Sequence, residues 1–127
     1  MTRGETGRLG EDVCARYLEK HGYTVVARNF HARCGEVDVI AETADELCFV
    51  EVKTRKENAM VSPVQAVGFR KQQKLVLTAQ VYLQQYPSKK QPRFDVFEVL
   101  TDPVGKPLRV RHLPGAFDAS CIDGLYY

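Results

Sequence analysis

The stretch GEVDVIAETADELCFVEVKTR, residues 35–55, decides the fold. Two apolar, β-branched runs flank the polar sequence T-A-D-E, which is the pattern of a β-hairpin. Both runs nevertheless contain charges, because Asp38 interrupts V-D-V-I and Glu51 and Lys53 interrupt F-V-E-V-K. An ionised group in such a strand is unfavourable unless it is paired, hydrated or bound to metal. These charges therefore face water or form a functional site.

The segment before the hairpin predicts a helix. Thr6 is expected to cap it, and Gly22 is expected to end it. Apolar residues recur at helical spacing along it and predict its buried stripe: Leu9, Val13, Cys14, Tyr17 and Leu18. Glu11 lies near the margin of this stripe.

A second helical region follows the hairpin. Ser62 as the N-cap, Pro63 at the first position and Gln65 in a capping box predict a helix start. Gly68 is expected to interrupt this helix, and a longer helix is expected over about residues 70–86, before Pro87.

The remaining pattern predicts a mixed sheet. The expected strands are residues 23–30, 37–41, 47–54, 93–100 and 108–113, with a turn over 31–35 and the last strand at an edge. The order α-β-β-β-α-β plus an edge strand predicts an α/β sandwich with a central mixed β-sheet flanked by helices. We expect a single domain over residues 1–127, with its core at about 6–113 and a C-terminal tail at 118–127 that is loosely ordered over 120–127.

Composition limits the class of protein. The chain has 127 residues, of which 44% are hydrophobic and 27% charged, as in an ordinary globular domain. No apolar run approaches the roughly 18 residues of a membrane helix, and the first residues lack a secretion signal, so we expect a cytoplasmic protein without a membrane partner. The four cysteines form no C-x-x-C pair, which favours reduced thiols over a zinc site.

Charge is distributed unevenly. From Lys53 to Arg93 there are nine lysines and arginines but one acid, Glu57, so this span carries +8 and the rest of the chain carries −6 of the overall +2. The asymmetry indicates a basic face that could meet phosphates, although a solvated helix surface would give the same composition.

Strand alternation constrains the charges of the hairpin. It puts Val37 and Val39 on one face and Asp38 on the other, and it puts Glu51 and Lys53 together on one face. If the strands pair so that both carboxylates fall on one side, they converge with an ammonium group near the open end of the hairpin. Such a group suits Mg²⁺, which prefers oxygen ligands.

Residue chemistry alone leaves two readings open. In one, a metal polarises a phosphodiester, Lys53 orients or deprotonates the nucleophile, and Glu11 completes the cluster. In the other, the charges are a salt-bridged strand pair. Asp95 is expected to have a structural role, as a partner of Arg93 or of a neighbouring strand.

Five motifs in chain order resemble one family. They are G-R-L-G-E-D-V-C-A-R-Y-L (7–18), N-F-H-A-R-C-G-E-V-D-V-I-A (29–41), F-V-E-V-K-T-R (49–55), R-K-Q-Q-K-L (70–75) and R-F-D-V (93–96). Together they resemble the YraN-like family of small bacterial proteins. That family looks like a branch of the PD-(D/E)xK nuclease superfamily, similar to the archaeal Holliday junction resolvases. The resemblance implies a restriction-endonuclease-like three-layer sandwich.

The resemblance also implies roles for individual residues. Asp38, Glu51, Lys53 and Glu11 match the catalytic residues, and the three acids among them match ligands of Mg²⁺ or Mn²⁺. Contacts with nucleic acid are implied or expected for four basic residues: Arg55, Lys56, Lys71 and Lys74.

The leading hypothesis is thus a Mg²⁺-dependent DNA endonuclease acting on branched or structured DNA, with DNA favoured over RNA. Two symmetric cuts would favour a homodimer. The alternative is a non-catalytic nucleic-acid-binding module that retains the nuclease fold, and a purely structural interaction domain ranks last.

Overall fold

The computed structural model describes residues 2–58 and 67–123. Its elements are α1 (Arg3–Lys20), β1 (Thr24–Ala32), β2 (Gly35–Glu42), β3 (Glu46–Lys56), α3 (Phe69–Gln85), β4 (Gln91–Thr101), β5 (Pro107–Phe117) and the short 3₁₀ helix η1 (Ala119–Ile122). The predicted strands and the longer second helix are therefore confirmed. The helix start predicted at Ser62, Pro63 and Gln65 lies outside the described residues.

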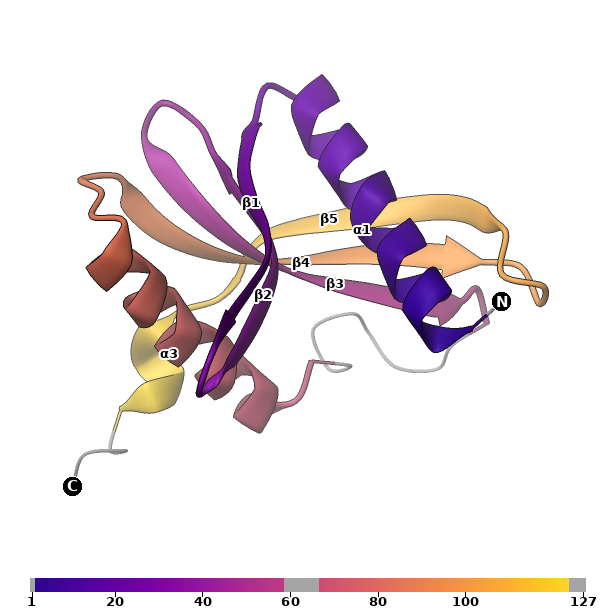
Figure 1. Cartoon of the computed structure of the whole chain (residues 1–127). Coiled ribbons are helices and arrows are strands. Elements are labelled where there is room, and N and C mark those ends of the chain that lie inside the picture. The colour runs from indigo at the N-terminus through magenta and orange to yellow at the C-terminus, as the bar shows by residue number, and fades with distance from the viewer. Residues whose placement is uncertain (1, 59–66, 124–127) are drawn as a thin grey trace.

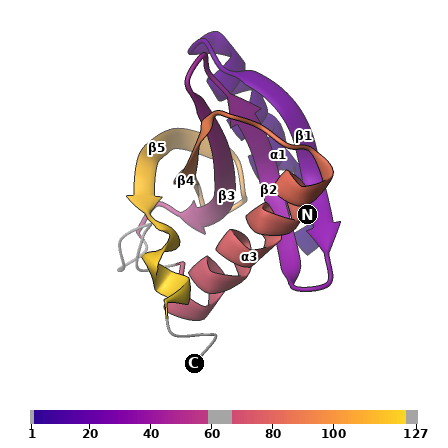
Figure 2. The same cartoon turned by 90° about the vertical axis from the view of Figure 1, so that its left-hand side faces the viewer.

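The five strands form one mixed sheet in the order β1-β2-β3-β4-β5. β3 and β4 are parallel and the other neighbours are antiparallel. The strands follow one another in the sheet in the same order as in the chain. Because β3 and β4 are parallel, the chain must cross over the sheet between them, and α3 lies in this crossover. The β1–β2 hairpin crosses steeply in front of the other strands, with α1 on one side of it and α3 on the other (Figures 1 and 2). The predicted three-layer α/β sandwich, with β5 at an edge, is confirmed.

Each face of the sheet has its own apolar core. On the α1 face the buried cluster contains Cys14, Leu18, Val39, Ala41, Cys48, Val50, Phe97 and Val99. On the other face α3 and η1 pack on a cluster that includes Val37, Ile40, Phe49, Leu75, Val76, Ala79, Tyr82 and Ile122. Burial on both faces explains why β2, β3 and β4 are nearly continuous apolar runs.

The first helix starts earlier than the sequence analysis expects. Thr2, rather than Thr6, is the N-cap, and its hydroxyl oxygen accepts a hydrogen bond from the backbone N–H of Glu5. The Thr6 hydroxyl instead donates to the Thr2 carbonyl oxygen. Thr2-x-x-Glu5 has the same spacing as a capping box, so a local signal for this start exists in the sequence.

Gly10 brings α1 close to β3. A side chain at this position would collide with the Thr54 hydroxyl group and would touch Val52 at 3.4 Å. The close approach places the next residue, Glu11, beside the cavity described below.

We expect Gly10→Leu to destabilise the protein by about 2–3 kcal/mol, because the larger side chain overpacks the contact between α1 and β3. Gly7→Ala is the matched control, since nothing lies within 4 Å of its added Cβ. It should be neutral or stabilising by roughly 0.5–1 kcal/mol through helix propensity. Urea unfolding of both variants measures the difference, and equal stability would show that the close approach is not required.

Two further expectations need correction. The turn expected over 31–35 consists of only Arg33 and Cys34, because β1 extends to Ala32 and β2 begins at Gly35.

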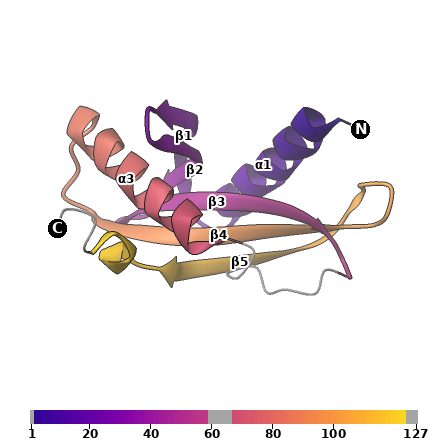
Figure 3. The ribbon, with the colours of Figure 1, turned by 90° about the horizontal axis from the view of Figure 1, so that it is seen from below.

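The tail is not loosely ordered at its start, since Cys121 and Ile122 are buried. The Gln73 side-chain amide of α3 donates to the Cys121 carbonyl oxygen at 2.8 Å. These contacts dock η1 on α3, at the opposite end of the molecule from the first turn of α1 (Figure 3).

No helix within residues 2–58 or 67–123 is long and apolar enough to cross a membrane.

Candidate active site

A cavity of about 590 Å³ lies where α1, the β2–β3 hairpin and α3 meet. Its lining includes Thr6, Gly7, Glu11, Glu36, Asp38, Glu51, Val52, Lys53, Thr54 and Lys71. All four predicted catalytic residues, Glu11, Asp38, Glu51 and Lys53, therefore line one cavity. Asp38, Glu51 and Lys53 lie at the open end of the hairpin, as predicted, and Glu11 reaches the cavity from α1.

Asp38 is held where β2 separates from β3. The ladder between these strands runs from Glu42↔Leu47 to Val39↔Val50 and stops before Asp38. In place of a ladder bond, the backbone N–H of Val52 donates to Asp38 Oδ2 at 2.8 Å. One oxygen of the carboxylate is thereby fixed by the backbone of β3.

The alternation assumed for this strand is wrong at Asp38. Val37 belongs to the core on the α3 face, whereas Val39 belongs to the core on the α1 face. The irregularity coincides with Asn29 in the neighbouring strand, which has a φ of 54° and lies between the pairs Arg28↔Val39 and Phe30↔Val37. A residue in this left-handed conformation interrupts the regular pleat.

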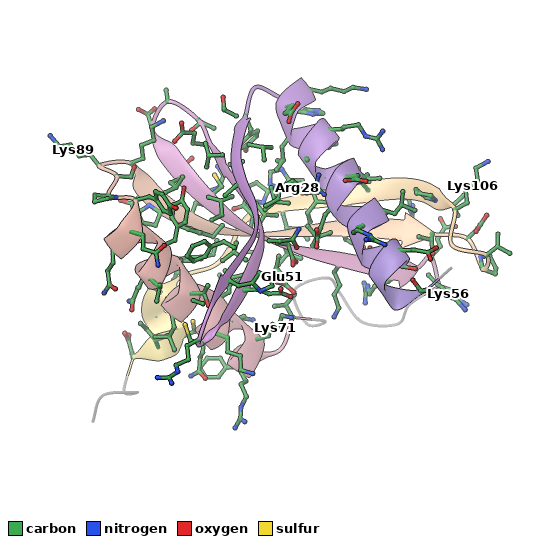
Figure 4. The ribbon with its side chains drawn as sticks, viewed as in Figure 1. Arg28, Glu51, Lys56, Lys71, Lys89 and Lys106 are labelled. Atoms are coloured by element: carbon green, nitrogen blue, oxygen red, sulfur yellow. The ribbon has the colours of Figure 1, made fainter. Side chains whose placement is uncertain are left out.

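Glu51 lies beside Asp38 and is the more deeply buried of the two, with 4% of its surface exposed against 9%. Its Oε1 atom is 3.2 Å from the ammonium group of Lys71, which reaches in from α3 (Figure 4). Its Oε2 atom has no hydrogen-bond partner among the described residues.

Burial raises the pKa values of both carboxyl groups, and repulsion by Glu51 raises that of Asp38 further. Burial, followed by the charge of Glu51, raises the pKa of Asp38 to about 8, despite the hydrogen bond from Val52. Burial also raises the pKa of Glu51, although the Lys71 ammonium opposes it. Two adjacent buried carboxyl groups thus lack enough positive charge to be ionised together at neutral pH.

Glu11 approaches the same cavity from α1. Its side chain is 12% exposed, and its Oε1 atom is 3.9 Å from Arg28 Nη2, which is an ion pair too long for a hydrogen bond. Arg28 hydrogen-bonds Asp12 instead, at 2.7 Å. Consequently Glu11 Oε1 is buried without a hydrogen-bond partner among the described residues.

The carboxylates fit a divalent cation in charge and chemistry. Asp38 and Glu51 offer carboxylate oxygens, the ligands that hard divalent cations prefer. Two buried oxygens, Glu51 Oε2 and Glu11 Oε1, receive no hydrogen bond in the described part of the chain. Within residues 2–58 and 67–123, however, no three histidine, cysteine, aspartate or glutamate side chains are grouped as ligands of one metal ion. The fit is thus to a cation held by two carboxylates and completed by water or substrate oxygens.

The predicted phosphate-binding residues do not form one group. Lys71 lines the carboxylate cavity together with Lys53, and Lys56 lines an adjacent hollow that shares Thr6 and Thr54 with it. Lys74 lines a third hollow, beside Glu36. The Arg55 guanidinium is only 12% exposed and pairs with buried Glu98, so a phosphate contact would require that pair to separate.

Two further acids were not predicted from the sequence. Glu36 lines the cavity beside Asp38 and pairs with His31 at 3.3 Å. Glu98 is fully buried between Arg55 and Arg111. The signal that identified Glu51, an acid in an apolar strand, also exists in V-F-E-V-L around Glu98.

Asp95 has the structural role that the sequence analysis favours. It accepts two hydrogen bonds from Arg93, at 2.9 and 2.8 Å, one from His112 at 2.8 Å and one from the Gly115 N–H at 3.0 Å.

All four cysteines are free thiols, as expected. Burial raises the pKa of the Cys48 thiol to about 12 and raises that of Cys14 as well, so neither is a nucleophile.

Comparison with known proteins places the site in a family. The sequence model of the uncharacterised protein family UPF0102 matches residues 10–99, which include every residue of the carboxylate cavity except Thr6 and Gly7. The chain belongs to this family. The YraN-like resemblance seen in the sequence motifs is thereby confirmed.

UPF0102 relatives align along nearly their whole length. A UPF0102 protein of Caldanaerobacter subterraneus subsp. tengcongensis is 44% identical over 92% of this chain and 98% of its own. One from Dictyoglomus turgidum is 38% identical over 92% of this chain and 100% of its own. One from Myxococcus xanthus is 42% identical, with 92% of each chain covered.

Proposed function

We propose that this protein is a divalent-cation-dependent endonuclease that hydrolyses phosphodiester bonds of branched or structured DNA in the cytoplasm. The observation that carries the proposal is the buried, undercompensated carboxyl pair of Asp38 and Glu51 in a cavity that also holds two lysines. Stability alone does not favour such a pair, because an apolar pair of similar size would avoid the desolvation of two charges.

Each residue of the cavity would have a separate role in cleavage. Asp38 and Glu51 would hold Mg²⁺ or Mn²⁺, with Asp38 fixed by the Val52 N–H. The bound cation would supply positive charge to the phosphate and lower the pKa of an attacking water. Lys53 would hold the scissile phosphate or orient the nucleophile, and Glu11 would accept a hydrogen bond from water at the cavity margin.

Basic residues at the cavity and beside it would bind the DNA backbone. Lys56 lies near the N-terminal end of α1 and Lys71 beside Glu51 (Figure 4). Contacts of this kind are to phosphates, so binding would weaken with salt and depend little on sequence. Cleavage of a symmetric junction would further favour a homodimer.

One observation favours a second candidate, a nucleic-acid-binding module without cleavage. No three potential ligands are grouped for a metal ion among the described residues, so a cation would need substrate or water to complete its coordination. A binding module would bind DNA in a salt-sensitive way without requiring the metal.

The deciding experiment is cleavage of labelled linear duplex, single-stranded, flap and four-way-junction DNA with Mg²⁺, Mn²⁺ or EDTA. We expect metal-dependent cutting by the wild type and a loss of at least about 100-fold in Lys53→Met, since the ammonium acts in the transition state. Lys89→Met is the control, because Lys89 is exposed at the far side of the molecule (Figure 4). Binding of all four DNAs without cutting would support the binding module, and cutting that survives EDTA would contradict the metal-dependent mechanism.

A further inference from the structure

The ion pair between Lys71 and Glu51 joins two very different environments. The Glu51 side chain is 5% exposed and comes from the middle of β3, whereas the Lys71 side chain is 50% exposed and comes from the first turn of α3. The ammonium group lies 3.2 Å from Glu51 Oε1. The carboxylate is thus fixed, while the flexible stem of the lysine is free to turn toward solvent.

This pair compensates only one of the two neighbouring carboxyl groups, Glu51. Asp38 and Glu51 are adjacent and buried, and Lys71 is the only ammonium group in the described structure that forms an ion pair with either of them. Lys53 lines the same cavity without such a pair. A divalent cation held by both groups would compensate two carboxylate charges, so that both groups could be ionised. Because Lys71 and that cation need the same carboxylate and repel each other, their occupancy of Glu51 is mutually unfavourable.

We infer that Lys71 is an exchangeable internal cation. It pairs with Glu51 until a divalent cation takes that carboxylate, and its ammonium is then released to bind a phosphate of the substrate. The inference rests on the proposed function, and it deepens it by linking metal loading to DNA binding. Lys71 is a positioning and phosphate-binding residue in this scheme, and its charge becomes available to DNA only in the metal-loaded protein.

The exchange makes two binding events cooperative. Metal binding frees a positive charge in the cavity, which strengthens phosphate binding, and by linkage a bound phosphate that holds Lys71 strengthens metal binding. A lysine that simply bound phosphate from an exposed surface would contribute equally with and without metal.

The first test is Mg²⁺ affinity measured by calorimetry on the full chain without DNA. We expect Lys71→Met to bind Mg²⁺ roughly tenfold more tightly than the wild type, because a competing charge within a few ångströms is removed. Lys74→Met is the matched control, since Lys74 lies one turn further along α3, is exposed and has no ion pair with Glu51. It should change the affinity by less than about threefold, through long-range charge alone.

The second test is binding of duplex and junction DNA with Ca²⁺ or with EDTA. Loss of Lys71 should weaken binding by about five- to tenfold in Ca²⁺ and by less than twofold in EDTA. For the wild type, the slope of log affinity against log salt concentration should be steeper in Ca²⁺ than in EDTA, by the amount that corresponds to about one phosphate contact. For Lys71→Met the slope should be the same in both conditions. Lys74→Met should weaken binding by the same factor in both conditions.

Two outcomes would overturn the exchange. Equal Mg²⁺ affinities in Lys71→Met and Lys74→Met would show that only net charge matters, and equal losses of DNA binding with Ca²⁺ and EDTA would show that Lys71 is never sequestered. The proposed function fails differently: absence of Mg²⁺ binding by the wild type removes the metal site and the exchange together, whereas absent cleavage with normal metal exchange removes only the nuclease activity. Circular dichroism confirms that each variant is folded.

Discussion

Replacing Asp38 with asparagine is expected to abolish cleavage and at the same time to stabilise the protein at alkaline pH. The loss of activity should be at least about 100-fold, because the variant lacks one of the two carboxylates that would hold the cation. The gain in stability should be about 2 kcal/mol at pH 8 in EDTA, which corresponds to roughly 5–10 °C in melting temperature. The asparagine oxygen can still accept the hydrogen bond from the Val52 N–H.

The pH dependence follows from the raised pKa of Asp38. Burial and the neighbouring Glu51 charge raise this pKa to about 8, far above the value in an unfolded chain. Between about pH 4 and pH 8 the folded state therefore binds a proton that the unfolded state has lost, so wild-type stability falls as pH rises through this window. Asp38→Asn removes the dependence, and its advantage should be large at pH 8 and nearly absent below pH 4.

Thermal unfolding at several pH values, with EDTA or Mg²⁺, measures both effects. Saturating Mg²⁺ should stabilise the wild type by about 1–3 kcal/mol and leave Asp38→Asn unchanged. Asp45→Asn is the control, because Asp45 is exposed in the turn between β2 and β3. A variant that is no more stable than wild type at pH 8 would mean that the Asp38 charge is already compensated, and undiminished cleavage would exclude Asp38 as a ligand.

Local patterns in the sequence were sufficient to predict the layers of the fold. Period-two and period-3.6 apolar spacing depends on neighbours in the chain, so the five strands and both long helices were found with small errors at their ends. The same logic identified Asp38 and Glu51, since a charge within an apolar strand is visible without tertiary information. Glu98 shows that the signal is not specific, because it marks a structural ion pair with Arg55 equally well.

What the sequence could not predict depends on contacts between distant segments. The pairing of Lys71 with Glu51 depends on where α3 crosses the sheet, and no spacing rule connects two residues on different elements. The opposite facing of Val37 and Val39 coincides with the positive φ of Asn29 in another strand, which no pattern within β2 reveals. Similarly, η1 is ordered by its contact with α3 rather than by its own helical propensity.

Replacing Asp95 with alanine is expected to destabilise the protein by about 3–5 kcal/mol, the largest loss of stability that we predict. Asp95 is fully buried, and its carboxylate holds Arg93, which also donates to Glu46 at 2.9 Å and to the Tyr23 hydroxyl at 2.8 Å. The network joins β4 to β3 and to the start of β1. Without Asp95, a guanidinium that is 16% exposed loses its two-point partner in a low-dielectric environment.

The double variant Arg93→Met with Asp95→Leu shows whether this loss comes from the unpaired charge of Arg93 or from poorer packing. The double variant leaves no unpaired guanidinium, and only His112 and the Gly115 N–H lose an acceptor, so it should recover at least half of the stability lost in Asp95→Ala. Glu57→Ala is the control, because its ion pair with Arg109 is about half exposed on both sides and should contribute little. If the double variant were as unstable as Asp95→Ala, the loss would come from packing rather than from the unpaired charge.

The same network predicts the response of the protein to acid. Burial alone would raise the pKa of Asp95, but hydrogen bonds from Arg93, His112 and the Gly115 N–H outweigh it and lower the pKa below its ordinary value. Its contribution to stability is therefore complete above about pH 4 and is lost as pH falls through the lowered pKa. Asp38 contributes in the opposite sense, so the wild type in EDTA should be most stable in mildly acidic solution. Asp95→Ala should remove the loss below pH 4 without altering the decline toward pH 8, and a decline that changed as well would show that the two buried acids are coupled.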